Sequence, residues 1–243
     1  MNGFFITGTD TGIGKTALSA LLLAELRRRG ISAAPMKAVQ TGCVKEGLRL
    51  EASDLRYSLS MAGMTVSEED RALMSPYRFE PACSPHLAAE LAGTEIELGQ
   101  IISAAQELAV EYDTLIVEGA GGVLVPLNRR ELMLDLMVKL NLPVLIAARP
   151  GLGTINHTLL SIRALKAAGL KIAGIVFIAS EEGELGLIEE DNVVTAEQFE
   201  AVPVLGTIPF CPQLQESAPR FSDLPVTVAA AIEKIASRLT CCF

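Results

Sequence analysis

A glycine-rich stretch near the N-terminus carries the side chains whose chemistry is most specific. Residues 4–16 read F-F-I-T-G-T-D-T-G-I-G-K-T, an apolar run that turns and delivers Lys15 and Thr16 to an expected helix at 17–29. The NH groups of such a loop converge on phosphate oxygens, the lysine adds positive charge, and the threonine hydroxyl is a ligand for Mg²⁺. Gly8 lies one residue further from Lys15 than in the common G-x-x-x-x-G-K-[ST] spacing. We therefore predict a variant phosphate-binding loop; a plain tight turn before a helix is the simpler alternative.

Three further side chains are expected near the same loop. Lys37 lies near the end of an expected strand at 32–39, Glu118 ends a buried apolar run, and Asp54 falls early in an expected helix. In open parallel sheets, ligands bind outside the carboxyl ends of the strands, so Lys37, Thr41 and Glu118 should face the crevice of the phosphate loop. Glu118 precedes a glycine-rich turn, where phosphate-loop enzymes place an acidic group for Mg²⁺. The simpler alternatives are a solvated lysine, a strand-ending glutamate and a helix-dipole partner.

The elements that must position these residues alternate between strand and helix. This order predicts a single α/β domain over 1–243, with a doubly wound, mostly parallel sheet between two helical layers. Half of the residues are hydrophobic but few are aromatic, which is typical of strands buried on both faces. Strands are expected at 4–8, 32–39, 114–118, 142–148, 171–179 and 202–208, and the longer helices at 17–29, 97–112, 151–168 and 226–239.

Composition excludes several functional classes. The formal charge of −9 argues against a nucleic-acid or polybasic membrane partner, because both need clustered cations. No apolar run has the length of a membrane span and no cleavable leader is recognisable, so a cytoplasmic location is expected. The five cysteines include no C-x-x-C pair, which predicts free thiols rather than a zinc site or a disulfide framework. Cys241 and Cys242 do not match the prenylation signal and are expected in an exposed tail.

Two helix starts could contact a ligand. Ser84, Pro85 and His86 fit an N-cap followed by proline at the first helical position. Because no acidic partner for His86 is visible nearby in the sequence, we expect a structural or substrate-contact role rather than proton transfer. The segment 151–157, G-L-G-T-I-N-H, opens another helix whose glycine-flanked NH groups could bind a carboxylate.

Together these motifs resemble the dethiobiotin synthetase family, and they occur in the family's order over nearly the whole chain. The quoted blocks are G-T-D-T-G-I-G-K-T at 8–16, Lys37 with Thr41 and Gly42, Asp54, P-Y-R-F at 76–79, S-P-H at 84–86, V-E-G-A-G-G-V-L-V-P-L at 117–127, G-L-G-T-I-N-H at 151–157 and L-G-T-I-P at 205–209.

The resemblance implies a reaction and a site. The substrates would be 7,8-diaminononanoate, CO₂ and ATP, and the reaction would pass through a carbamate and a carbamic-phosphoric anhydride to dethiobiotin, ADP and phosphate. Family members are homodimers with the active site at the subunit interface. The implied catalytic residues are Lys15, Lys37 and Thr11; the Mg²⁺ ligands are Thr16, Asp54 and Glu118. The implied nucleotide-binding residues are Gly12, Ile13, Gly14, Lys15, Thr16, Ala17, Asp54, Glu118, Gly119, Ala120, Gly121, Ile208, Pro209 and Phe210. The implied substrate-binding residues are Thr41, Gly153, Thr154, Ile155 and Asn156.

Three other interpretations fit the sequence less well. Partition or septum-positioning ATPases usually carry a second lysine early in the loop, and residues 8–12 contain none. An amidoligase of the cobyrinate type needs a glutamine-hydrolysing domain, for which this chain lacks the length. A degenerate nucleotide-binding module is disfavoured because Lys15, Thr16, Asp54 and Glu118 are all present.

Two positions depart from the family pattern. Gly12 replaces the glutamate of some members, and we expect activity to survive because the loop keeps its flexibility. Ile178 stands where the family usually has an asparagine that reads the adenine edge, and an isoleucine neither donates nor accepts a hydrogen bond. Base recognition would then fall to backbone groups around Ile208 to Phe210, or be relaxed.

We therefore predict that this protein discriminates less among nucleoside triphosphates than is usual in the family. Competition assays with ATP, GTP and CTP should give similar turnover efficiencies. Strong selectivity for ATP would contradict the prediction.

Overall fold

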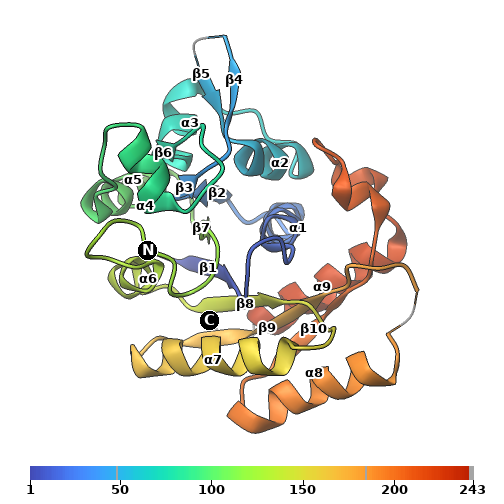
Figure 1. Cartoon of the computed structure of the whole chain (residues 1–243). Coiled ribbons are helices and arrows are strands. Elements are labelled where there is room, and N and C mark those ends of the chain that lie inside the picture. The colour runs from blue at the N-terminus through green and yellow to red at the C-terminus, as the bar shows by residue number, and fades with distance from the viewer. Residues whose placement is uncertain (48, 184, 241–243) are drawn as a thin grey trace.

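Runs of consecutive buried residues build a six-stranded parallel sheet in the computed structural model, which describes residues 1–47, 49–183 and 185–240 (Figure 1). The strand order is β10-β9-β8-β1-β7-β2, so β7 lies between the first two strands of the chain and β8 lies on the other side of β1. The sheet strands are β1 (Gly3–Gly8), β2 (Ala33–Lys37), β7 (Thr114–Glu118), β8 (Val144–Ala148), β9 (Ile172–Ile178) and β10 (Val204–Ile208). This arrangement confirms the predicted doubly wound α/β class.

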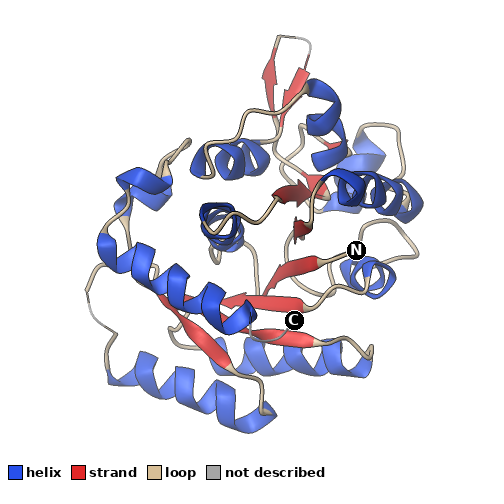
Figure 2. Ribbon diagram, turned by 180° about the vertical axis from the view of Figure 1, so that it is seen from behind, coloured by secondary structure: helices blue, strands red, loops and turns tan. Residues whose placement is uncertain are grey.

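Each face of the sheet packs against its own hydrophobic core. Phe5 belongs to one core while its neighbours Phe4 and Ile6 belong to the other, because successive side chains of a strand point to opposite faces. The core with Phe5 is completed by α5 (Leu98–Glu111), α6 (Met133–Leu140) and α7 (Thr154–Ala167). The opposite core is completed by α1 (Lys15–Arg28) and α9 (Val226–Thr240). Figure 2 shows helices on both sides of the strands, which gives the expected three layers.

Smaller elements surround the edge at β2. Helix α2 (Ser53–Met61) contributes to both cores, and Val39–Gln40 (β3) leaves the main sheet to pair with Tyr77–Arg78 (β6). The observed second strand, Ala33–Lys37, is therefore shorter than the predicted strand at 32–39. The remaining elements are β4 (Val44–Glu46), β5 (Arg49–Glu51), α3 (Glu68–Met74), α4 (Pro85–Leu91), α8 (Leu187–Glu200), η1 (Pro212–Gln215) and η2 (Phe221–Asp223).

Helices α3 and α8 were not expected from the sequence. Their apolar periodicity is weak because each buries few side chains: Met74 in α3, and Asn192 and Ala196 in α8. The predicted start of α4 is confirmed, with Ser84 at the N-cap and Pro85 in the first turn. Within the described residues, none of the helices combines the length and hydropathy needed to cross a membrane.

The cysteines described by the structure carry free thiols. Cys43 and Cys211 are buried and Cys83 is half-buried. The predicted exposed tail with Cys241 and Cys242 lies outside the described residues.

The register of the sheet places chemistry at one edge. In parallel pairing, Glu118 of β7 lies directly beside Ile6 of β1 on one side and Lys37 of β2 on the other. The carboxyl ends of these three strands therefore meet next to the glycine-rich loop that follows β1.

Truncation of a buried phenylalanine should cost much more stability than truncation of an exposed one. Phe177 in β9 is 0% exposed and Phe199 in α8 is 69% exposed. We expect Phe177→Ala to lower the free energy of unfolding by about 3–5 kcal/mol, because it removes a packed ring and leaves a cavity. Phe199→Ala should change it by less than about 0.5 kcal/mol. Equilibrium urea unfolding of both variants checks this; equal losses would contradict the packing described here.

Candidate functional site

The glycine-rich loop turns sharply before α1. Gly14 is the N-cap of α1 with φ at 96°, a left-handed conformation that favours glycine. A Cβ at this position would lie 2.9 Å from Cδ1 of Ile178, so the loop is packed directly on the end of β9. The turn folds the first residue of α1 back over the loop, where the Lys15 ammonium donates a hydrogen bond to the Asp10 carbonyl at 2.8 Å.

A buried cluster of charges lies beside this loop. Nζ of Lys37 is 2.7 Å from Oε1 of Glu118 and 2.7 Å from Oδ2 of Asp54. The Thr16 hydroxyl donates to the same Glu118 oxygen at 2.8 Å. Four elements therefore converge: β2 supplies the ammonium, α2 and β7 the carboxylates, and α1 the hydroxyl. Lys37 and Lys15 both lie at the edge formed by the carboxyl ends of the strands, as the predicted common crevice requires.

The ionisation of the cluster follows from its geometry. Burial alone would lower the pKa of Lys37, but the Glu118 and Asp54 carboxylates raise it above its ordinary value, so the ammonium keeps its charge. Burial would raise the pKa of Asp54, yet the charge and hydrogen bond of Lys37 hold it below the usual range. Burial raises the pKa of Glu118 against the opposing effect of Lys37.

Lys15 is in a different electrostatic position. It has no carboxylate within ion-pairing distance in the described residues, and its ammonium rests on a carbonyl oxygen. Burial, and then the nearby charge of Lys37, lower the pKa of Lys15 to about 8. The group is thus a poorly compensated cation, which is stabilised when an anion binds next to it.

The oxygens of Thr16, Asp54 and Glu118 suit a hard divalent cation. They comprise two carboxylates and one hydroxyl, joined through Lys37 and through the hydrogen bond from Thr16 to Glu118. The described residues contain no group of three or more His, Cys, Asp and Glu side chains that would hold a metal by themselves. The two carboxylates and the hydroxyl are hard oxygen donors of the kind that Mg²⁺ accepts, and Mg²⁺ usually completes its shell with water and phosphate oxygens.

A cleft of about 520 Å³ opens over the loop and the charge cluster. It is lined by Thr11, Gly12, Gly14, Lys15, Thr16, Ala17, Lys37, Val39, Gln40, Thr41, Asp54, Tyr57, Glu118, Ala120, Gly121, Leu214, Gln215 and Glu216. Most of the predicted nucleotide-binding residues are thus brought together. Ile13, Gly119 and the segment 208–210 do not line this cleft: Ile13 and Ile208 are buried in the core.

The start of α7 lies beside the loop but outside this cleft. Gly153 and Thr154 line a neighbouring cavity of about 320 Å³ together with Thr9 and Asp10 of the loop, whereas Ile155 and Asn156 do not. Helix α8 holds the segment that precedes α7: the buried Asn192 amide donates to the Pro150 carbonyl at 2.9 Å. The predicted substrate residues are therefore divided, with Thr41 in the cleft and the others beside the far end of the loop.

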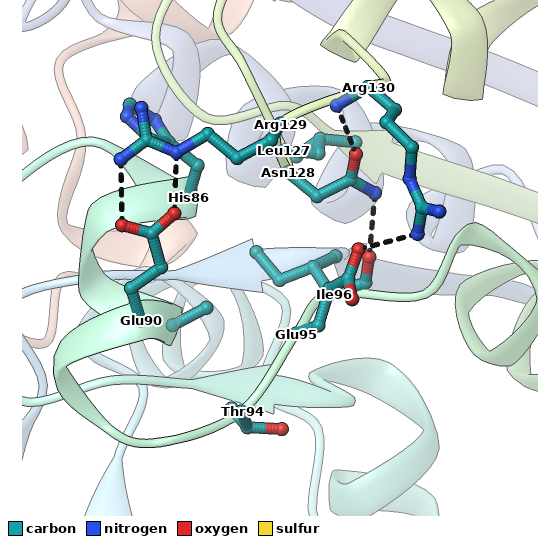
Figure 3. A pocket seen from close by; sticks show the side chains of 10 residues that line it. His86, Glu90, Thr94, Glu95, Ile96, Leu127, Asn128, Arg129 and Arg130 are labelled. Carbon is teal, nitrogen blue, oxygen red and sulfur yellow. Dashed lines mark hydrogen bonds and ion pairs between the residues drawn. The ribbon is translucent and has the colours of Figure 1, made fainter.

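His86 lies in a separate cavity of about 380 Å³ (Figure 3). Two arginines reach across it to two glutamates: Arg129 binds Glu90 through two contacts of 2.6 and 2.8 Å, and Arg130 binds Glu95 at 2.8 Å. The expectation that His86 has no acidic neighbour was wrong: Glu90 follows it by four residues, one turn further along α4, and its carboxylate is paired with Arg129. His86 does not line the cleft of Lys15 and Lys37.

Several lining residues were not identified from the sequence. The Gln40 side chain accepts from the Asp54 backbone NH at 3.3 Å, and the Tyr57 hydroxyl donates to the Leu214 carbonyl at 2.9 Å. Tyr57 follows Asp54 by three residues, which puts both on one face of a helix, and that spacing could have identified it. Leu214 to Glu216 carried no such signal, because only the folded chain brings them to the loop.

Solved structures share this fold at low sequence identity. The complex of the cell division proteins MinC and MinD from Aquifex aeolicus matches with a TM-score of 0.64 and 17% identity, covering 99% of this chain and 96% of that chain. The cell division ATPase MinD from Pyrococcus furiosus matches with a TM-score of 0.62 and 17% identity over 100% of both chains. At this identity the similarity extends to the fold alone.

Sequence comparison is more specific. A family model described as an AAA domain matches residues 2–218. An ATP-dependent dethiobiotin synthetase from Halalkalibacterium halodurans is 40% identical over 215 residues, covering 88% of this chain and 87% of that protein. Another from Lysinibacillus sphaericus is 36% identical over 99% of both chains. With the phosphate loop and the buried Lys37 cluster in one cleft, these matches show that the chain belongs to the ATP-dependent dethiobiotin synthetase family.

Proposed function

We propose that this enzyme carboxylates 7,8-diaminononanoate with CO₂ and closes its ureido ring at the expense of ATP. The observation that carries the proposal is the Lys37 ammonium, held by Asp54 and Glu118 in the same cleft as Lys15 and Thr16. One lysine next to a phosphate loop serves nucleotide binding in general. A second, buried lysine in that cleft suits a reaction that brings another anion to the terminal phosphate.

The proposed reaction has three steps. One amine of the substrate adds to CO₂ and loses a proton, which gives a carbamate. A carbamate oxygen attacks the γ-phosphorus, and the bond from phosphorus to the β–γ bridging oxygen breaks, which gives ADP and a carbamic-phosphoric anhydride. The second amine then attacks the carbonyl carbon and expels phosphate with loss of a proton. The anhydride is needed because a carbamate oxygen is a poor leaving group until it is phosphorylated.

The side chains of the cleft suit positioning and charge stabilisation. Lys15 and Lys37 offset the negative charge of the carbamate and of the transferring phosphoryl group. Thr11 and Thr41 line the cleft and carry hydroxyls that can bind phosphate or carbamate oxygens. No strong general base is required of the protein, because phosphoryl transfer depends mainly on alignment and electrostatics.

Mg²⁺ would be held by Thr16, Asp54 and Glu118 together with phosphate and water oxygens. When bound, it supplies positive charge that neutralises the phosphates during transfer. Gly12, whose Cβ position is open, leaves room for the phosphates to approach the backbone.

We further propose a homodimer in which the start of α7 serves the cleft of the partner. Gly153 and Thr154 line a cavity that is distinct from the cleft of their own chain. Three large apolar side chains nearby, Leu124, Leu152 and Leu160, are exposed and would be covered by a second subunit. The α7 helix start would then hold the carboxylate of the neighbouring substrate with its free NH groups.

A reconstituted reaction tests the function. Purified protein with diaminononanoate, bicarbonate, Mg²⁺ and ATP should give a product with the mass of dethiobiotin and one ADP per product. Phosphate release that does not depend on the diamine would instead indicate an ATPase switch.

Replacing Lys37 should separate binding from chemistry. We expect Lys37→Ala to reduce ring closure by at least about a thousandfold, because it removes a charge that stabilises the transferring group. ADP binding by calorimetry should persist within about tenfold, since Lys15 and the loop remain. The exposed Lys139, which pairs with Glu131 on the surface, offers a matched Lys139→Ala control that should behave as wild type. Full turnover by Lys37→Ala would remove this lysine from the mechanism.

Nucleotide affinity should depend on alkaline pH through Lys15. Its pKa in the free protein is about 8, and a bound phosphate favours the charged form and raises that pKa. The contribution of the ammonium is therefore complete below pH 8 and is lost as the pH rises through this value. We expect the dissociation constant of ADP to increase by up to about tenfold per pH unit above pH 8. Calorimetry from pH 7 to 9.5 measures this, and Lys15→Met should show weak binding with no such dependence.

A further inference from the structure

A short segment after β10 forms part of the wall of the nucleotide cleft. Leu214, Gln215 and Glu216 line it together with Lys15 and Thr16, although they lie about two hundred residues further along the chain. Leu214 is buried, whereas Gln215 and Glu216 are exposed and present an amide and a carboxylate.

The segment has few internal restraints. It is a single 3₁₀ turn, η1, followed by an extended residue. The backbone NH groups of Leu214 and Glu216 donate to Cys211 and Gln213, which belong to the same turn. Such hydrogen bonds shape the turn, and the buried Leu214 side chain packs in the core that contains α1, but neither fixes the backbone of the exposed Gln215 and Glu216.

Tyr57 of α2 supplies a long-range attachment. Its hydroxyl donates to the Leu214 carbonyl at 2.9 Å across 157 positions of sequence, and the bond is buried. The Tyr57 ring is 8% exposed and belongs to the core that contains α1, so the donor is rigidly held. Burial, and then the nearby Cys211 and Glu216, raise the pKa of the Tyr57 phenol above its ordinary value, so the hydroxyl stays protonated and can donate.

The same helix carries a candidate metal ligand. Asp54 lies in the first turn of α2 and Tyr57 follows one turn later on the same face, with both side chains lining the cleft. α2 therefore connects the end of the cleft where phosphates would bind with the wall formed by Leu214–Glu216.

We propose that Tyr57 is a positioning residue that holds the segment 214–216 against the nucleoside part of the bound nucleotide. The inference rests on the proposed nucleotide site. Phosphates bound by Lys15 and Thr16 occupy the loop end of the cleft, so the ribose and base extend toward another wall. Ile178 is buried against Gly14 and offers no hydrogen-bonding group. Gln215 and Glu216 offer both a donor and acceptors for a nucleoside.

The substitution Tyr57→Phe removes the hydroxyl and keeps the ring. We expect the dissociation constant of ADP to rise about 3- to 10-fold, because the backbone of the segment loses its hydrogen bond to α2 and is held only through the packing of Leu214. Binding of inorganic triphosphate, which has no nucleoside, should be unchanged. In turnover, the effect should fall on the KM for ATP more than on kcat. Unchanged ADP binding, or equal weakening of both ligands, would overturn the proposal.

A matched control distinguishes positioning from general stability. Tyr77 is 7% exposed, and outside the cleft its hydroxyl donates to Gln100 at 2.9 Å and accepts from the Glu97 backbone NH at 2.9 Å. Tyr77→Phe removes both hydrogen bonds, so it should lower the Tm at least as much as Tyr57→Phe without changing the affinity for ADP. An equal loss of ADP affinity in both variants would assign the effect to stability and contradict the role of Tyr57.

A double-mutant cycle tests the connection to the segment. Glu216→Ala should weaken ADP binding, and the combination with Tyr57→Phe should cost less than the sum, because a loosened segment no longer presents Glu216. Strict additivity would show that Tyr57 does not act through the segment. These measurements need no diamine, so a protein that binds ADP but makes no dethiobiotin would refute the proposed function and leave this test intact.

Discussion

The structure depends on one buried ammonium group. Lys37 is almost entirely enclosed, and a charge in such a place is tolerated only when it is paired and hydrogen-bonded. Glu118 and Asp54 meet that requirement at 2.7 Å each. Because these partners come from β7 and α2, the charge constrains three elements that are separated in the sequence. The sheet satisfies the constraint by pairing Lys37 and Glu118 directly across neighbouring strands.

The loop after β1 divides two regions of different chemistry. Its Lys15 side faces the cleft with the charge cluster, and Thr9 and Asp10 face the cavity at the start of α7. A charged cleft on one side and an exposed apolar surface with free helix NH groups on the other are suited to different parts of an amphipathic substrate. The residues predicted as one functional set from the sequence therefore line two separate cavities in a single chain.

The fold of this chain does not by itself specify its function. Cell division ATPases such as MinD share the architecture at 17% identity, so the sheet does not by itself specify a ligase. The more specific features of this chain are local: residues 8–12 contain no lysine, and Lys37 of β2 is buried beside the carboxylates of Asp54 and Glu118. The family assignment comes instead from sequence relatives at 36–40% identity.

The sequence alone determined the alternation of strands and helices, the phosphate loop and the residues Lys15, Thr16, Lys37, Asp54 and Glu118 as one chemical set. These were readable because periodicity, glycine positions and strand ends are local properties of the chain. Tertiary structure alone decided that β7 lies between β1 and β2, that Lys37 is shared by two carboxylates, and that Tyr57 holds Leu214–Glu216 beside the loop. Strand order and contacts between distant segments depend on packing the whole chain, and no local pattern encodes them.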